Sequence, residues 1–148
     1  VVDCTSYPFK IARPGSITES MLESVVPGCI TEADYNAEAP IAPGMKYRHY
    51  APNSPVQLID GGIRSALTVD AATAVIAPES VRKWIDGGHF YPLCADEHDI
   101  ETAAARLYDV LRSIDHNHAV KQIILSGFER TEAARALMNR IDKASSGQ

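Results

Sequence analysis

Short apolar runs alternate with longer amphipathic segments along most of the chain. The runs are typical of buried strands, and we expect strands at residues 56–60, 73–77, 90–95 and 122–126. Apolar residues at helical spacing predict a long helix capped by Asp99 and a final helix capped by Thr131, with a shorter helix at 79–86. Strands and helices that alternate in this way form crossover units around a mostly parallel sheet. The pattern therefore predicts a three-layer α/β domain.

A second, smaller group of elements is predicted before this domain. Two short strands fall near Val1–Asp3 and Phe9–Ala12, and Ser16 and Glu19 have the spacing of a capping box at the start of a helix. The apolar face of this helix comprises Met21, Leu22, Val25 and Val26. Two strands and one helix are too few to bury a core, so we expect this region to need packing partners. Val1 itself looks like the middle of a strand, which predicts that the sequence is a fragment.

No hydrophobic periodicity is present between these two regions. Prolines interrupt this part of the chain at four positions, Pro40, Pro43, Pro52 and Pro55. Proline restricts the backbone to extended conformations and lowers the entropy that is lost when a segment becomes ordered. The region is therefore predicted to be a linker or a functional strap.

Composition narrows the possible functions. Apolar residues make up 45% of the chain and the net charge is −5, which argues against a broad nucleic-acid-binding face. The apolar runs are too short for a membrane span. The three cysteines, Cys4, Cys29 and Cys94, are far apart and odd in number, which argues against a disulfide framework or a zinc site and favours a reducing cytoplasm. Each is predicted to be a small buried residue.

The α/β region offers few candidates for chemistry. Gly61-Gly62 follows a strand, but the full G-x-G-x-x-G pattern of dinucleotide sites is absent, so a strand-to-helix turn is the better interpretation. The histidines have no metal-ligand spacing, and we expect no metal site and no catalytic residue in this chain. Asn139 and Arg140 form a polar pair on the last helix. They fit an exposed stripe, or a contact with an anion or another domain.

The stretch APGMKYRHYAP, residues 42–52, is unusual for a loop because it gathers cations and aromatic rings. Lys46 offers a point charge for phosphate, Arg48 a planar fork and His49 a switchable donor. Tyr47 and Tyr50 offer flat faces for a base. In an extended strap, alternate side chains face opposite ways, so one face could hold a nucleotide while the other packs on a domain. An ordinary linker with a few packed rings fits these residues equally well.

The same stretch closely resembles the PGMKY-x-HYAP linker of the two-domain threonylcarbamoyl-AMP synthases. These enzymes join a YrdC-like catalytic domain to a smaller Rossmann-like C-terminal domain. Residues 1–3, 11–15 and 17–18 resemble the end of the catalytic domain, and residues 105–112 and 136–141 resemble two helical signatures of the C-terminal domain. The resemblance implies a catalytic-domain remnant, an interdomain linker and a Rossmann-like α/β domain, at residues 1–27, 28–55 and 56–148 respectively.

The resemblance also implies an activity. Such enzymes are nucleotidyltransferases that condense L-threonine, bicarbonate and ATP, with Mg²⁺ accompanying the ATP, to threonylcarbamoyl-AMP and pyrophosphate. The product feeds tRNA modification by downstream proteins. By this resemblance Arg13 and a linker tyrosine, most simply Tyr50, contact ATP. The linker forms a lid near the nucleotide with its remaining residues, Lys46, Tyr47, Arg48 and His49.

Two considerations limit what this chain is expected to do. Most of the catalytic domain, with its basic nucleotide-binding residues, is expected before Val1, so we predict that the chain alone is inactive. The alternative is a non-catalytic α/β module at residues 56–144, which binds a protein partner or holds a nucleotide at the carboxyl ends of its strands.

Overall fold

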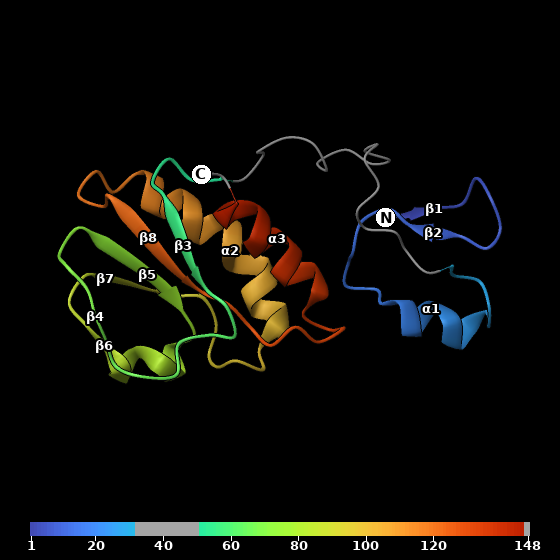
Figure 1. Ribbon diagram of the computed structural model, residues 1–148, viewed down its shortest axis with the longest axis horizontal. Coiled ribbons are helices and arrows are strands. Elements are labelled where there is room, and N and C mark those ends of the chain that lie inside the picture. The colour runs from blue at the N-terminus through green and yellow to red at the C-terminus, as the bar shows by residue number, and fades with distance from the viewer. Residues whose placement is uncertain (32–50, 147–148) are drawn as a thin grey trace. The chain divides into compact units, whose positions relative to one another are not determined.

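The computed structural model describes residues 1–31 and 51–146 (Figure 1). Predictions that concern residues 32–50 and 147–148 lie outside this part of the chain. The chain divides into two compact units, Val1–His49 and Tyr50–Gln148. In the described ranges, no helix combines the length and the apolar character needed to cross a membrane. Neither unit shares a sheet with the other.

The first unit is a small β-hairpin followed by a helix. Strands β1 (Val2–Asp3) and β2 (Lys10–Ile11) pair antiparallel, and helix α1 spans Glu19–Val25. The predicted cap at Ser16 is wrong. Thr18 is the N-cap, because its hydroxyl accepts a hydrogen bond from the backbone N–H of Met21 at 3.3 Å.

The first unit leaves much of its apolar surface uncovered. Helix α1 has no buried residue, and Ile17, Met21 and Val25 are 62%, 53% and 79% exposed. This agrees with the expectation that the region needs packing partners. Cys29 is buried, as predicted, but Cys4 is exposed in the turn between the two strands, contrary to the prediction.

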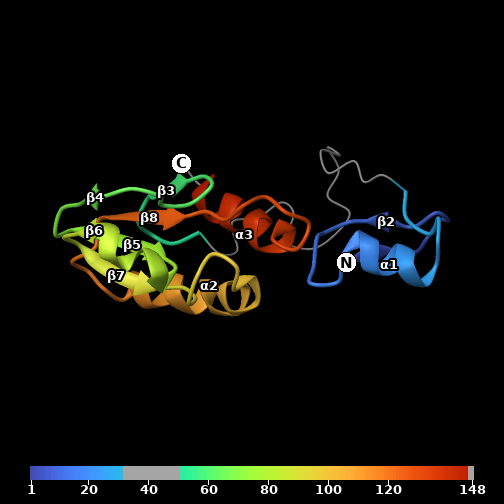
Figure 2. The same ribbon diagram turned by 90° about the horizontal axis from the view of Figure 1, so that it is seen from below.

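The second unit is built on a four-stranded parallel sheet, as predicted. Its strands are β3 (Val56–Ile59), β5 (Thr73–Ala77), β7 (His89–Pro92) and β8 (Gln122–Ser126). Their order is β3-β8-β5-β7, and every pairing is parallel. Figure 2 shows β8 and β5 between the two edge strands. A separate two-stranded parallel sheet pairs β4 (Leu67–Thr68) with β6 (Ile85–Asp86).

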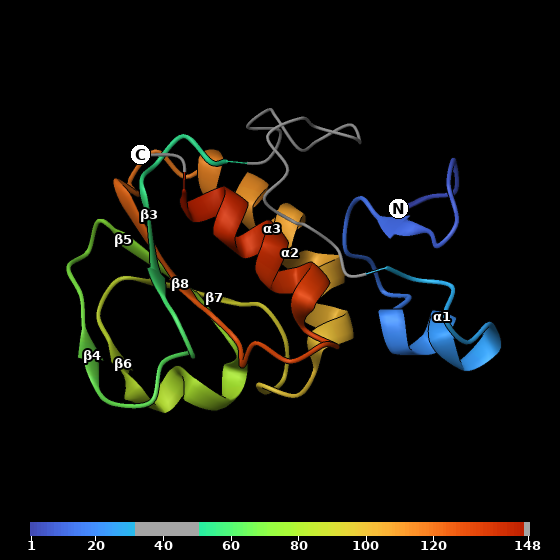
Figure 3. The same ribbon diagram turned by 45° about the vertical axis from the view of Figure 1, so that its right-hand side comes forward.

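Each face of the four-stranded sheet is covered by different elements. Ile123 and Leu125 of β8 belong to one core together with helices α2 (Ile100–Asp115) and α3 (Arg135–Ser145). These helices lie side by side (Figure 3). Ile124 belongs to a second core on the opposite face, which includes Ile63, Val81 and Ile85. Two covering layers and one sheet make the three-layer α/β arrangement, with the second covering layer thin.

Three predicted elements differ in the structure. The helix expected at 79–86 is a 3₁₀ helix, η1 (Glu79–Trp84). It ends at Trp84 because the next two residues pair with β4 as strand β6. The strand expected at 90–95 is β7, which ends at Pro92. The turn at Gly61-Gly62 leads to β4 and not to a helix.

Helix caps are predicted with mixed success. Asp99 caps α2 as predicted, since its carboxylate accepts from the N–H of Thr102 at 3.3 Å. Thr131 accepts from the N–H of Ala134 at 3.2 Å, but this bond closes a turn, and α3 begins only at Arg135. The local sequence therefore locates the first residue of each of these helices to within one turn.

Candidate functional site

Most residues of the predicted ATP lid lie outside the described part of the chain. This applies to Lys46, Tyr47, Arg48, His49 and Tyr50. Arg13 is described and is exposed in the turn after β2. The carbonyl oxygen of Val1 accepts hydrogen bonds from the backbone N–H groups of Ala12 and Arg13, with N···O distances of 2.9 and 3.2 Å. These bonds shape the turn. The roles of Arg13 and of the lid residues stay predictions.

The polar pair Asn139 and Arg140 is half-buried on α3. The guanidinium of Arg140 donates to the carbonyl oxygen of Ala104 at 3.3 Å and lies 6.0 Å from the ring of Tyr108. Ala104 and Tyr108 both belong to α2, so this arginine joins the two helices. A contact of this pair with an anion or another domain stays a prediction.

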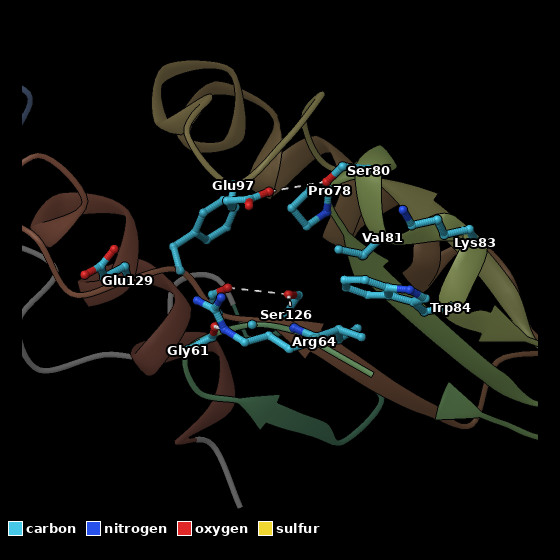
Figure 4. A pocket seen from close by; sticks show the side chains of 14 residues that line it. Gly61, Arg64, Pro78, Ser80, Val81, Lys83, Trp84, Glu97, Ser126 and Glu129 are labelled. Atoms are coloured by element: carbon cyan, nitrogen blue, oxygen red, sulfur yellow. Dashed lines mark hydrogen bonds between the residues drawn. The ribbon is translucent and has the colours of Figure 1, made fainter. Parts of the chain in front are cut away.

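A pocket of about 240 Å³ lies at the carboxyl ends of three neighbouring strands (Figure 4). The segment after β3 contributes one wall, the segment after β8 a second, and η1, which follows β5, a third. Glu97, which follows β7, completes the lining. In open parallel sheets this edge is where ligands bind.

Close backbone packing forms the base of the pocket. Gly62 has φ of +88°, and a Cβ there would lie 3.0 Å from the carbonyl oxygen of Gly127. A Cβ at Gly127 would lie 3.0 Å from the carbonyl oxygen of Ile59. Glycine at both positions lets the turns after β3 and β8 approach this closely without displacing a backbone carbonyl. The hydroxyl of Ser126, only 1% exposed, accepts from the N–H of Ile63 at 3.2 Å and holds the two turns together.

The side chains around this base are apolar at one end and charged along two sides. Figure 4 shows Val81 and Trp84 together at one end and Arg64 opposite Glu97. Arg64 is oriented by a hydrogen bond from its Nε to the carbonyl oxygen of Gly61 at 3.1 Å. The lining thus contains two cationic and two carboxylate side chains: Arg64, Lys83, Glu97 and Glu129.

An ion network lies beside the pocket, and two of its residues, Asp60 and Arg130, are next to the pocket lining in the sequence. Arg130 donates from both terminal nitrogens to the carboxylate of Asp142 at 2.9 Å, and its Nε lies 3.2 Å from the carboxylate of Asp60. These hydrogen bonds, first to Asp142 and then to Asp60, raise the pKa of Arg130. The network joins the end of β3, the loop after β8 and helix α3.

The sequence indicates this edge of the sheet but not the residues of the pocket. The alternative function places a nucleotide at the carboxyl ends of the strands, whereas Gly61-Gly62 is predicted only as a turn and the sequence suggests no role for Arg64, Trp84 or Glu97. Each pocket segment directly follows a strand, and that was the available signal. The signal becomes informative only once the order of the strands in the sheet is known.

Comparison with known proteins identifies relatives over nearly the whole chain. A profile of the family described as threonylcarbamoyl-AMP synthase, C-terminal domain, matches residues 17–146. A threonylcarbamoyl-AMP synthase of Bacillus subtilis (strain 168) is 34% identical over 158 residues, which covers 100% of this chain and 45% of the relative. One from Pyrococcus abyssi (strain GE5 / Orsay) is 32% identical over 154 residues, which covers 98% and 44%.

The fold agrees with a solved relative. The crystal structure of P. abyssi Sua5 complexed with L-threonine matches with a TM-score of 0.71 and 26% identity, over 99% of this chain and 45% of that chain. The chain therefore spans about half the length of the relatives that it matches.

Proposed function

The chain belongs to the family of threonylcarbamoyl-AMP synthase C-terminal domains, and from this we propose that it acts in the synthesis of threonylcarbamoyl-AMP for tRNA modification. The observation that carries the proposal is the family match, which runs from the start of α1 to the end of α3. In this proposal a YrdC-like catalytic domain holds most of the active site. It condenses L-threonine, bicarbonate and Mg²⁺-bound ATP, with release of pyrophosphate, in the cytoplasm. The L-threonine complex of P. abyssi Sua5 supports threonine as a substrate.

The first unit, which contains the predicted remnant of the catalytic domain, would pack against the rest of that domain. Ile17, Met21 and Val25 expose large apolar side chains on and beside a short helix. Burial of such side chains against a partner is favourable by roughly 25 cal/mol for each Å² removed from water. We therefore assign this surface to domain packing and not to a ligand.

The linker would act as a lid over the nucleotide. Arg13 and Arg48 can each make bidentate contacts with phosphate, and Tyr50 can stack on the base. Because prolines restrict the linker, closing it over a ligand loses less conformational entropy than closing a flexible loop would. A lid of this kind would keep the reactive adenylate away from water.

Substitution of the two predicted ATP contacts tests the lid. In an enzyme that contains this chain and the catalytic domain, we expect Arg13→Ala to lower kcat/KM for ATP by about ten- to a hundredfold, the loss typical of a charge-assisted hydrogen bond. Tyr50→Ala should weaken ATP use or release the adenylate. Arg112→Ala, on the exposed side of α2, is the matched control. Wild-type kinetics and full retention of the adenylate in both variants would show that the linker is only a tether.

The isolated chain provides a second test. We expect residues 1–148 to release no pyrophosphate from ATP, L-threonine and bicarbonate above a heat-killed control, because the proposal assigns the active site to the catalytic domain. Pyrophosphate release that depends on all three substrates would contradict this assignment. Tight ATP binding by the isolated chain would favour the alternative, a nucleotide-binding module.

A further inference from the structure

The pocket of the second unit lies where the connections from neighbouring strands diverge. The chain leaves β8 towards α3, which covers one face of the sheet, whereas it leaves β3 and β5 towards Ile63 and η1, which cover the opposite face. A crevice opens at such a point because no connection crosses it, and ligands of open α/β sheets bind there. The position of this pocket therefore follows from the topology and not from an accidental gap between side chains.

The charged groups around the pocket are not paired with one another. In the described part of the chain, no ion pair is found for Arg64, Lys83, Glu97 or Glu129. The ammonium group of Lys83 lies 5.3 Å from the centre of the Trp84 ring. The Nε of Arg64 donates a hydrogen bond to the carbonyl oxygen of Gly61. The two terminal nitrogens of its guanidinium can therefore make a bidentate contact with a carboxylate. Glu97 has only a long contact of 3.5 Å with the hydroxyl of Ser80.

The size and the charge balance of the pocket indicate the class of ligand. Its volume of about 240 Å³ is below the usual range for pockets that bind drug-sized ligands. The two cationic and two carboxylate side chains of the lining balance in charge, which favours a ligand of zero net charge over a multiply charged phosphate group. A small molecule with one negative and one positive end would satisfy both kinds of lining charge. An apolar group on it would contact Val81 and Trp84.

From these observations we propose that the second unit binds a free α-amino acid in this pocket. The carboxylate of the ligand pairs with the terminal nitrogens of Arg64. Its ammonium group lies towards the carboxylate of Glu97, and its side chain contacts Trp84. This site is separate from the proposed catalytic reaction, so it is tested by binding and does not depend on activity.

The chain itself supplies the probe, because Trp84 is its single tryptophan and lines the pocket. The twenty common L-amino acids, AMP and inorganic phosphate would be titrated against residues 1–148 and followed by Trp84 fluorescence, with calorimetry for tryptophan. We expect at least one amino acid to bind saturably with a Kd below about 1 mM. Its methyl ester and its N-acetyl derivative should bind at least tenfold more weakly, since each lacks one charge.

Three variants locate the site. Arg64→Gln should weaken binding by about ten- to a hundredfold and Glu97→Gln should weaken it less, both with an unchanged unfolding midpoint. Arg112→Gln should bind like the wild type. The proposal is overturned if no amino acid binds, if only AMP or phosphate binds, if the ester and N-acetyl derivatives bind equally well, or if Arg64→Gln has no effect.

Discussion

Gly87 gives the most direct test of how the second unit is packed. Its φ of +82° lies in the left-handed region, and a Cβ there would overlap the carbonyl oxygen of Val69. Gly61 has nearly the same backbone conformation, with φ of +73°, but nothing lies within 4 Å of the Cβ position. The pair therefore separates the conformational cost of alanine from the cost of a clash.

The expected magnitudes differ accordingly. Alanine in the left-handed region costs roughly 1 to 2 kcal/mol, which is the whole effect expected for Gly61→Ala. At Gly87 the clash with backbone adds about 1 to 3 kcal/mol, because a carbonyl group cannot rotate away as a flexible side chain can. With an m-value near 2 kcal/mol/M in urea, the midpoint of Gly87→Ala should fall about 0.5 to 1.5 M below that of Gly61→Ala.

Urea unfolding followed by tryptophan fluorescence measures this difference. Trp84 is the single tryptophan and belongs to the second unit, so the signal does not report the first unit. Two variants with the same midpoint would refute the reasoning. That result would mean that the Gly87 loop moves away from Val69 at little cost.

Two further predictions concern charged and titratable groups. Burial, followed by the nearby carboxylates of Asp99 and Asp96, raises the pKa of Cys94 from 9.0 to about 12. The folded protein should therefore protect this thiol from iodoacetamide at pH 8 while exposed Cys4 reacts, as mass spectrometry would show. Because the Cys94 thiol loses its proton at lower pH in the unfolded chain than in the folded protein, the free energy of unfolding should fall as the pH rises from about 9 to 12. The fall should be smaller in Cys94→Ala. An equal fall in both proteins would contradict the raised pKa of Cys94. Arg130→Gln should lower the urea midpoint. The difference in midpoint from the wild type should shrink in 1 M NaCl, where the Debye length is about 3 Å and salt screens exposed charges. A difference in midpoint that does not depend on salt would exclude an electrostatic origin.

Local signals in the sequence were enough for several elements. Strand β8 could be predicted because its apolar run is continuous. Helix α2 could be predicted because apolar residues recur at helical spacing over its sixteen residues and Asp99 supplies a cap at its start. The alternation of strands and helices was enough for the parallel α/β class. The resemblance in residues 42–52 led to the family, and the comparisons confirm that family.

Contacts between distant residues decided the rest. Residues 85–86 were predicted as the end of a helix, but their backbone pairs with β4, about eighteen residues earlier in the chain. The sequence did not reveal that β8 lies between β3 and β5, since strand order depends on which apolar faces bury one another. The pocket depends on that order, because its walls follow three strands that meet only in the folded sheet. Local periodicity and capping chemistry thus determined the elements, whereas long-range burial determined the site that they form together.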